Sequence, residues 1–384
     1  MRDKCNLAIR PKVVLFVVNA PEFFLSHRFP LAVAAQSAGY EVHVATADGA
    51  DVAHIQASGF THHVVPFARS GQNPLNELTT LWCLLSLSRR LKPDLMHLIT
   101  IKPVLYGGIA ARVAGIKAVV SAVSGLGTVF MAESKSARVR RWLVTGLYRS
   151  AFKQRRLAVI FQNPDDRDTL LSLGALTQNQ VRMIRGSGVV LEDYPCVPEP
   201  EGVPVVVMAA RLLKDKGVFE FVEAARLIKQ RGVQIVVRLI GSPDPGNPTS
   251  VTQQELDQWA DESGIELLGY RNDIARQYAG ASIVCLPSYR EGLPKSLVEA
   301  AACGRAVVTT DVPGCRDAIT PGETGILVPV KDPVALADAI QTLAENRTLR
   351  LKMGLAGRNL AETEFAIEKI VEQHMGIYQE LINP

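Results

Sequence analysis

The sequence predicts an α/β protein made of two doubly wound domains that face a central cleft. Short apolar runs rich in β-branched residues alternate with amphipathic helical patterns along the whole chain, which is typical of parallel sheets covered by helices. With 384 residues, the chain is also too long for one hydrophobic core. The alternation stops at residues 192–204, where four prolines and four acidic residues gather. We therefore place one domain at residues 1–190 and a second at residues 191–365.

The expected strands are the apolar β-rich runs, and each half of the chain supplies six of them. In the first half they span residues 13–18, 41–46, 62–67, 95–99, 118–123 and 158–162. In the second half they span residues 203–209, 235–241, 265–269, 283–287, 306–310 and 325–329. Between them, helical patterns predict helices over residues 27–38, 77–91, 217–231, 293–303 and 333–345. Residues 366–384 are also helical in pattern, and the sequence leaves open whether that helix packs back on the first domain.

Composition predicts a globular cytosolic protein. Hydrophobic residues make up 47% and charged residues 21% of the chain, and there is no low-complexity tract. The six cysteines are scattered without a Cys-x-x-Cys pair, which indicates reduced thiols rather than a disulfide scaffold. The apolar run at residues 13–18 is far too short to span a bilayer. We therefore expect neither a signal peptide nor a transmembrane helix.

Charge is spread unevenly along the chain. Residues 1–187 hold 23 Lys and Arg against 11 Asp and Glu, whereas residues 188–384 hold 19 against 27. Residues 134–164 hold eight basic residues and no acidic residue. Apolar residues interleave with these basic residues at roughly helical spacing: Trp142, Leu143, Leu147, Tyr148 and Phe152.

The basic segment has two interpretations. One is a helix over residues 134–156 that rests on anionic lipid headgroups, because a merely solvated face seldom lacks acidic residues over such a length. The other is an ordinary amphipathic helix whose apolar side faces the core. Nucleic acid is not expected as a partner, because no RRM, KH or helix-turn-helix signature accompanies the charge.

Two segments of the second half are suited to an anionic ligand. Arg211 follows the expected strand at residues 203–209, and Lys216 stands just before the helix that follows it. Two cations at a strand end, beside a helix N-terminus, suit a diphosphate. Gly241 ends another expected strand, where the missing side chain lets a ligand approach the backbone.

A third segment adds two carboxylates. Glu291 lies in a loop after an expected strand, and Gly292 and Leu293 offer backbone N–H groups at the start of the next helix, with Pro294 in its first turn. Glu299 lies about two turns into that helix, roughly 9–10 Å along its axis. One carboxylate for a sugar hydroxyl, one for a ribose, and cations with backbone N–H groups for the phosphates describe a sugar nucleotide.

These segments resemble the retaining glycosyltransferases of family 4, which have the GT-B fold of two Rossmann-like domains. The stretch PSYREGLPKSLVEAAACGRAVVTTDVPGCRDAI resembles the E-x7-E segment of that family, AARLLKDKGVFEF its diphosphate segment, and GSGVVLEDY its inter-domain crossing. In the first half, residues 23–46, 69–78, 97–108 and 124–130 resemble a bacterial subgroup. Its members extend polyprenyl-diphosphate-linked glycans for O-antigen, capsule or protein glycosylation, and one branch transfers N-acetylgalactosamine.

The resemblance implies a role for each matching residue. Arg211 and Lys216 would bind the donor diphosphate, Glu291 the donor sugar hydroxyls and Glu299 the ribose. Gly292 and Leu293 would bind phosphate through the backbone. It also implies a UDP-sugar donor, a lipid-linked saccharide acceptor, and a peripheral position on the inner face of the bacterial cytoplasmic membrane.

The first half departs from the family pattern in two places. His97 is present, but Ile99 occupies the position of a second histidine, and the usual Gly-Gly loop after the first strand is absent. Acceptor-side or inter-domain contacts are therefore assigned only as candidates: His27, His97, Lys102, Ser124, Gly125, Gly127 and Gly188. For His97, a core position is an equally good interpretation.

The resemblance implies transfer with retention at the anomeric carbon. No pair of carboxylates is placed as in retaining glycoside hydrolases, so we expect front-face departure of the nucleoside diphosphate, whose own oxygen takes the acceptor proton. Arg211, Lys216 and the helix N-terminus would neutralise the leaving group, so no cofactor or metal is expected. The alternatives are a sugar-nucleotide epimerase or hydrolase on the same fold, and a non-catalytic sugar-nucleotide-binding subunit. A nicotinamide-dependent enzyme is disfavoured, because no Gly-x-Gly-x-x-Gly follows the first strand.

Overall fold

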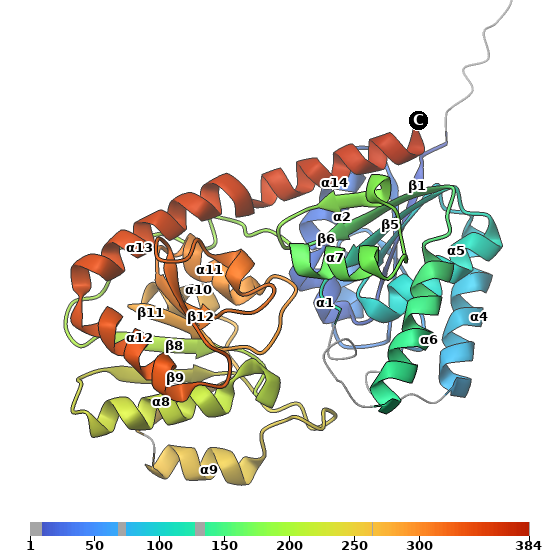
Figure 1. Ribbon diagram of the computed structural model, residues 1–384. Coiled ribbons are helices and arrows are strands. Elements are labelled where there is room, and N and C mark those ends of the chain that lie inside the picture. The colour runs from blue at the N-terminus through green and yellow to red at the C-terminus, as the bar shows by residue number, and fades with distance from the viewer. Residues whose placement is uncertain (1–9, 68–73, 127–134, 263, 384) are drawn as a thin grey trace, which may run out of the picture.

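The computed structural model describes residues 10–67, 74–126, 135–262 and 264–383 and contains two parallel sheets (Figure 1). The first sheet has seven strands in the order β3-β2-β1-β4-β5-β6-β7. They are β1 (Val13–Val18), β2 (Glu41–Thr46), β3 (Thr61–Val64), β4 (Leu95–Ile99), β5 (Ala118–Val123), β6 (Arg156–Phe161) and β7 (Val181–Met183). The sequence pattern did not indicate β7, because that strand is only three residues long and none of its residues is buried.

The second sheet has six strands in the order β10-β9-β8-β11-β12-β13. They are β8 (Val205–Ala209), β9 (Val236–Ile240), β10 (Ile265–Gly269), β11 (Ile283–Leu286), β12 (Ala306–Thr310) and β13 (Gly325–Val328). In both sheets the chain starts at a central strand and adds strands toward one edge. It then returns to the centre and adds strands toward the other edge. This is the doubly wound order of Rossmann-like domains, so the expected fold class is confirmed.

Helices cover both faces of each sheet. In the first domain they are α1 (Pro21–His27), α2 (Phe29–Ser37), α3 (Val52–Ala57), α4 (Pro74–Leu91), the π-helix η1 (Pro103–Gly107), α5 (Gly108–Ala114), α6 (Lys135–Ala151) and α7 (Pro164–Ser172). In the second they are α8 (Val218–Gln230), α9 (Gln253–Glu262), α10 (Ile274–Ala279), α11 (Lys295–Ala302), α12 (Pro333–Glu345) and α13 (Arg347–Leu360). The helix expected at residues 27–38 is broken at Arg28, two residues before Pro30, whose ring cannot continue a helix from the preceding turn.

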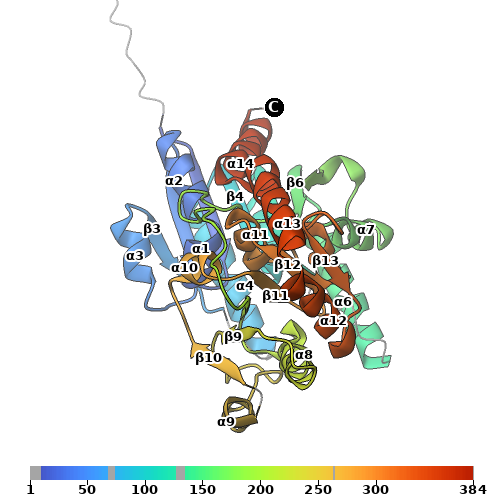
Figure 2. The same ribbon diagram turned by 90° about the vertical axis from the view of Figure 1, so that its left-hand side faces the viewer.

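The chain crosses between the domains twice, and the crossings lie side by side. Val189 N donates to Phe365 O at 2.9 Å, and Ile367 N donates back to Val189 O at 3.0 Å. The second crossing continues into α14 (Ile367–Ile382), the red helix that reaches from the second domain across the first in Figures 1 and 2. Its apolar side, including Tyr378 and Leu381, is buried in the core of the first domain.

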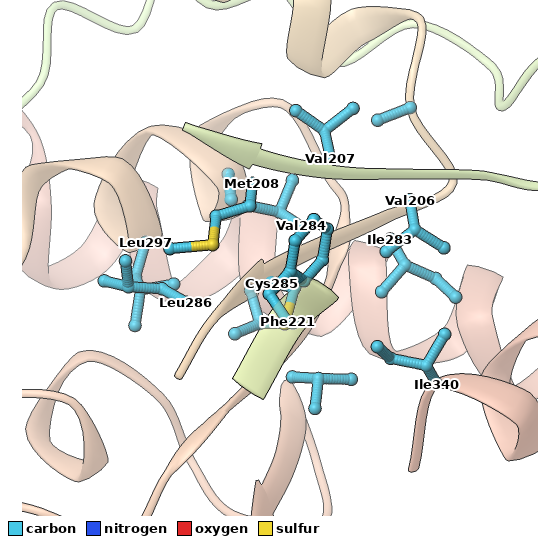
Figure 3. Packing of buried hydrophobic residues seen from close by; sticks show 14 of the residues in the cluster. Val206, Val207, Met208, Phe221, Ile283, Val284, Cys285, Leu286, Leu297 and Ile340 are labelled. Carbon is cyan, nitrogen blue, oxygen red and sulfur yellow. The ribbon is translucent and has the colours of Figure 1, made fainter. Parts of the chain in front are cut away.

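The core of the second domain holds the site-bearing loops in place. Strands β8 and β11 are central in their sheet and carry apolar residues on both faces, as buried parallel strands do. Figure 3 shows Leu297 of α11 beside Leu286 of β11, with Met208 of β8 nearby. This packing anchors the start of α11 against the ends of the two central strands.

Candidate active site

The two central strands of the second sheet define a topological switch point. After β8 the chain turns to one face and after β11 to the other, so the loops at their carboxyl ends diverge. Ligands of open parallel sheets bind in the crevice that such diverging loops leave. Arg211 and Lys216 follow β8, and Glu291 follows β11, so the fold brings the three residues to the same edge of the sheet.

Lys216 and Glu291 form an ion pair at this edge. Lys216 Nζ donates to Glu291 Oε1, and the hydroxyl of Ser288 donates to the same oxygen at 2.7 Å. Both charged side chains are mostly buried, at 18% and 14% exposure. Partly buried charges interact more strongly than surface charges because less water screens them. The two residues, which are 75 positions apart in sequence, therefore form a compact polar centre.

Arg211 lies further out. Its guanidinium contacts Asp244 at 3.2 Å, and its side chain is 64% exposed. Ion pairs at such exposure contribute little to stability, so the guanidinium is free to exchange this partner for an anion. Asp244 lies in the loop after β9, three residues after Gly241.

The backbone conformation at position 241 requires glycine. Its φ is +142°, and a Cβ at this position would lie 1.9 Å from Ala210 O. No side chain fits there, and the missing Cβ lets the chain pass close to the end of β8. The approach of a ligand to the Gly241 backbone stays a prediction. Gly217, which follows Lys216, is similar: its φ is +74°, and a Cβ would lie 2.0 Å from Pro287 O.

The helix after Glu291 begins later than the sequence suggested. α11 starts at Lys295, and Pro294 is its N-cap, with ψ at 122°, rather than a residue of the first turn. Leu293 and Gly292 thus precede the helix. The prediction of a helix over residues 293–303 was wrong at this end, because the residue before the helix needs an extended ψ. Glu299 consequently lies about one turn, not two, inside α11.

Glu299 is almost buried and already has two partners. Tyr194 donates its hydroxyl to Glu299 Oε1 at 2.5 Å, and Lys295 Nζ lies 3.3 Å from the same oxygen. Burial, and then the charge of Glu299, raise the pKa of Tyr194 well above its usual range. Tyr194 therefore keeps its proton and is a hydrogen-bond donor that holds the carboxylate in place. It comes from the crossing segment GSGVVLEDY, for which the sequence suggested no such contact.

Two of the first-domain candidates meet the donor-side loop directly. A Cβ on Gly292 would lie 2.6 Å from Ser124 O, and a Cβ on Gly125 would lie 3.3 Å from Gly292 N. Gly125 has a φ of +107°, which favours glycine. Among the described residues, the buried hydroxyl of Ser124 has no hydrogen-bond partner. Gly127 lies outside the described residues.

His27 lies at the end of α1. Its ring stacks on Phe23 with centroids 4.0 Å apart, and its Nδ1 lies 2.7 Å from Ser26 Oγ. Burial, together with the charges of Arg28 and Lys295, lowers the pKa of His27 to about 3. The charge of Lys295, which begins α11, contributes to this lowering of the pKa of His27. Its imidazole is neutral at physiological pH.

The candidate role of His97 at the acceptor side is corrected. His97 is fully buried in the middle of β4, under α14, where its Nδ1 lies 2.5 Å from the hydroxyl of Tyr378. Its ring also lies near those of Phe16 and His374. Burial holds its pKa well below the usual value. The strand-end position that the sequence suggested is occupied by Ile99 and Thr100, so His97 is a core residue.

The remaining two candidates have partners away from the donor-side loops. Lys102 Nζ donates to Glu77 Oε1 of α4 at 2.7 Å. Gly188 has a φ of +80°, and a Cβ there would lie 2.8 Å from Ile367 Cδ1. Gly188 thus permits the close pairing of the two inter-domain crossings, which is a structural role.

The first domain adds two residues that sequence reasoning missed. Asn163 and Asp166 at the start of α7 bind the backbone and the arginine of the turn around Glu291, through Gly292 O and Arg290. The signal in the sequence was Asn-Pro-Asp-Asp after a strand, a helix start with Pro in its first turn. That pattern indicates a helix cap but not what else the cap contacts.

The chain contains one Asp-x-Asp spacing, at Asp166 and Asp168. The two carboxylates have different partners: Asp166 is buried against Arg290, and Asp168 pairs with its neighbour Arg167 on the surface. Over the described residues there is no group of three or more His, Cys, Asp or Glu arranged to hold a metal ion. Nor does any helix in that part of the chain combine the length and hydropathy needed to cross a membrane.

Comparison with known proteins assigns both halves to glycosyltransferase families. Residues 13–163 match the family described as glycosyl transferase 4-like, and residues 195–360 match glycosyl transferases group 1. The chain is 29% identical over 382 residues to the N,N'-diacetylbacillosaminyl-diphospho-undecaprenol alpha-1,3-N-acetylgalactosaminyltransferase of Campylobacter jejuni, covering 94% of this chain and 98% of that protein. It is 28% identical to the capsular polysaccharide biosynthesis glycosyltransferase CapM of Staphylococcus aureus, over 45% of each protein.

Solved structures agree on the fold. Sucrose-phosphate synthase of Thermosynechococcus elongatus superposes with a TM-score of 0.80 at 19% identity, over 96% of this chain and 99% of that one. Anabaena HepE in complex with UDP-glucose superposes with a TM-score of 0.75 at 19% identity, over 96% and 99%. With two parallel-sheet domains, two family matches and these neighbours, the chain is a hexosyl-transferring glycosyltransferase with the GT-B fold, built from a glycosyl transferase 4-like domain and a group 1 domain.

Proposed function

We propose that the protein transfers an N-acetylhexosamine, such as N-acetylgalactosamine, from a UDP-sugar to a polyprenyl-diphosphate-linked saccharide during surface-glycan or glycoprotein-glycan assembly. The observation that carries the donor side is the polar centre of Lys216 and Glu291 at the switch point of the second sheet. Similarity along 94% of the chain to a transferase named for a diphospho-undecaprenol acceptor supports the acceptor class.

In this proposal each charged group has one part of the donor. Lys216 and the exposed guanidinium of Arg211 bind the diphosphate, assisted by backbone N–H groups of Gly292 and Leu293. Glu299 binds the ribose: both of its present contacts involve Oε1, and Oε2 is the oxygen that we assign to the ribose diol. Glu291 binds hydroxyls of the transferred sugar. When the donor binds, the ion pair between Lys216 and Glu291 is replaced: the diphosphate binds Lys216, and hydroxyls of the sugar bind Glu291.

The reaction that follows from these roles retains the anomeric configuration. The bond from the anomeric carbon to the diphosphate oxygen breaks, and the acceptor hydroxyl forms a new bond on the same face. The released diphosphate oxygen accepts the proton of that hydroxyl. Lys216 and Arg211 stabilise the charge that develops on the leaving group, which is the electrostatic contribution expected from preorganised cations. Neutral His27 is suited to orient the acceptor hydroxyl.

We further propose that transfer needs no metal ion, because two cations of the chain can neutralise the diphosphate. The initial rate should be the same with and without a chelator such as EDTA. A rate that falls on chelation and returns with Mg²⁺ or Mn²⁺ would refute metal independence without affecting the proposed substrates.

We also propose that α6 docks the first domain on anionic lipid. The apolar residues of this segment differ in exposure: Tyr148 of α6 and Phe152, just after it, are buried in the core, whereas Trp142 and Leu143 of α6 are 73% and 54% exposed. The interpretation as a core-facing helix thus holds for the buried residues, and the exposed apolar pair supports the proposed docking. Helices α4 and α6 both pack against α5 and η1, and Trp82 of α4 is also 69% exposed. Exposed tryptophans beside basic residues are typical of membrane interfaces.

Vesicle co-sedimentation tests the docking. Binding to vesicles of anionic lipid should weaken with added salt, and the double variant Arg140→Glu/Arg141→Glu should remain in the supernatant. The control is Arg231→Glu/Arg238→Glu in the second domain, which should pellet like the wild type. Equal pelleting of both double variants would refute docking through α6.

A transfer assay tests the function. The wild-type protein should convert a UDP-N-acetylhexosamine and a polyprenyl-diphosphate-linked acceptor sugar into an extended lipid-linked product and UDP. Without acceptor, the donor should stay intact. Conversion of the donor without acceptor would instead indicate an epimerase or a hydrolase, and tight donor binding without any product would indicate a non-catalytic subunit.

A further inference from the structure

The turn that carries Glu291 is held from the other domain. Arg290, the residue before it, forms an ion pair through Nη2 with Asp166 Oδ1 at the start of α7. Gly292, the residue after it, accepts a hydrogen bond of 2.7 Å on its carbonyl oxygen from Asn163 Nδ2. Asn163 and Asp166 belong to the first domain. We call residues 290–292 the donor-sugar turn. Its conformation therefore depends on where the first domain lies.

Asp166 has no exposed surface, at 0%. A buried carboxylate is costly unless charge or hydrogen bonds compensate it. Two side chains do so here: Arg290 on Oδ1, and Asn163 Nδ2 on Oδ2 at 3.1 Å. Asn163 also accepts from Asp166 N at 2.8 Å and caps α7. Since Arg290 is the partner that brings positive charge, burial of Asp166 is favourable only while Arg290 stays in place.

The turn has little room to take another conformation. On one side, a Cβ on Gly292 would lie 2.6 Å from Ser124 O and 2.7 Å from Gln162 Oε1 of the first domain. On the other side, a Cβ on Gly314 would lie 2.5 Å from Glu291 O. Glu291 N also donates to Pro313 O at 3.1 Å. The backbone around Glu291 is thus enclosed between the first domain and the loop after β12.

We propose that Asp166 is a positioning residue for the donor-sugar turn. It acts through Arg290, with Asn163 as its support, and fixes Glu291 and Gly292 when the two domains are together. The nucleotide contacts, in contrast, all come from the second domain. It follows that UDP binds without this contact, whereas sugar transfer requires it. The inference rests on the proposed function for what Glu291 binds, but not for the contact itself.

Kinetics of Asp166→Asn give the first test. The variant keeps the size of the side chain and removes its charge, so it should lower kcat about 10- to 100-fold, the scale for a misplaced reacting group. Its affinity for UDP should stay within about twofold. Asp168→Asn is the matched control, because Asp168 lies on the same helix and is exposed, and its one ion pair within the described part of the chain is with neighbouring Arg167. The kcat of this variant should equal that of the wild type.

Arg290→Gln should reproduce the loss from the other side of the pair. Because both changes remove one interaction, the double variant should lose no more kcat than either single variant, rather than the product of the two losses. Arg290 lies in a loop at 18% exposure, so this variant keeps the test available if Asp166→Asn does not fold. Multiplying losses would mean that the two residues act independently and would overturn the proposal.

Hydrogen exchange gives a readout that does not depend on activity. Backbone amides of residues 289–293 should exchange faster in Asp166→Asn and Arg290→Gln than in the wild type. Their exchange rates in Asp168→Asn should equal those of the wild type. If the wild type transferred no sugar at all, the proposed function would fail while this exchange pattern would still decide the positioning role. Wild-type exchange in both variants, whatever their kcat, would overturn it.

Discussion

The donor-side loops of the second domain and the facing loops of the first domain contribute to one site in different ways. In the second domain, Lys216 and Glu291 bring opposite charges to adjacent loops, on a sheet whose order fixes where those loops diverge. In the first domain, the contacts to the same turn come from Ser124 and from Asn163 and Asp166 of the α7 cap, and the sequence pattern of a helix cap does not indicate such contacts. One side of the site is encoded in short segments, and the other arises only from how the domains meet.

This difference separates binding from positioning. Groups that bind a diphosphate must carry charge at the end of a strand, so they leave a visible pattern in the sequence. Groups that position a turn need only the correct shape and one hydrogen bond or ion pair. Loss of a group that binds the nucleotide should therefore reduce donor affinity and rate together, whereas loss of a contact that only positions the turn should reduce the rate alone.

The largest effect is expected from Lys216→Ala. It removes the cation nearest to both the diphosphate and Glu291, so kcat/KM should fall by about 10²- to 10³-fold, the scale for a lost preorganised electrostatic contact. Lys214→Ala changes an exposed lysine two residues away and serves as the control. Steady-state kinetics with a UDP-sugar measures both. Activity of Lys216→Ala equal to that of Lys214→Ala would place the diphosphate elsewhere.

Gly292→Ala should reduce the rate of transfer without a matching loss of UDP affinity. Its added Cβ meets Ser124 O and Gln162 Oε1 of the first domain, while alanine keeps the backbone N–H of residue 292, so kcat should fall about 10-fold or more while UDP affinity changes little. Gly376→Ala, in α14, adds a Cβ with no atom within 4 Å and should be neutral. If Gly292→Ala loses UDP affinity as strongly as kcat, the two domains do not divide the work in this way.

Much of the fold and of the donor side could be predicted from the sequence, for physical reasons. Strands buried on both faces are continuous apolar runs, and for that reason β1, β2, β4, β5 and β12 have the expected bounds. The edge strand β10 has the expected bounds as well, although it is only partly buried. The start of α11 could not be predicted as well, because Pro294 fits both an N-cap and a first helical turn. A histidine on an apolar strand does not reveal which element covers it, so the position of His97 under α14 required the structure.

A smaller effect distinguishes the domains by pH. All seven histidines lie in residues 27–97 or in α14, which packs on the first domain. Burial lowers the pKa of His374 to about 3 and holds that of His97 well below its usual value. Since the folded-state pKa is depressed, this stability is complete above about pH 6.5, the unfolded-state value. Below that pH it should fall by about 1.4 kcal/mol per pH unit for each such histidine.

Limited proteolysis at pH 7.5 and pH 5.5 measures this difference. Cleavage at the lower pH should begin in the first domain and in α14, while the second domain, which has no histidine, stays resistant. His374→Gln should reduce the difference between the two pH values. Equal sensitivity of both domains at pH 5.5 would contradict the assignment of the acid-labile groups.

The assignment of the two glutamates is tested most directly by calorimetric titration of Glu291→Gln and Glu299→Gln with UDP. UDP contains the ribose and the diphosphate but no transferred sugar. Glu299→Gln should therefore weaken UDP binding about 10-fold or more, the range for a hydrogen bond to a charged group. Glu291→Gln should bind UDP as well as the wild type or better, because Lys216 no longer has a competing carboxylate. Weak binding by Glu291→Gln together with normal binding by Glu299→Gln would contradict the division of the donor site proposed here.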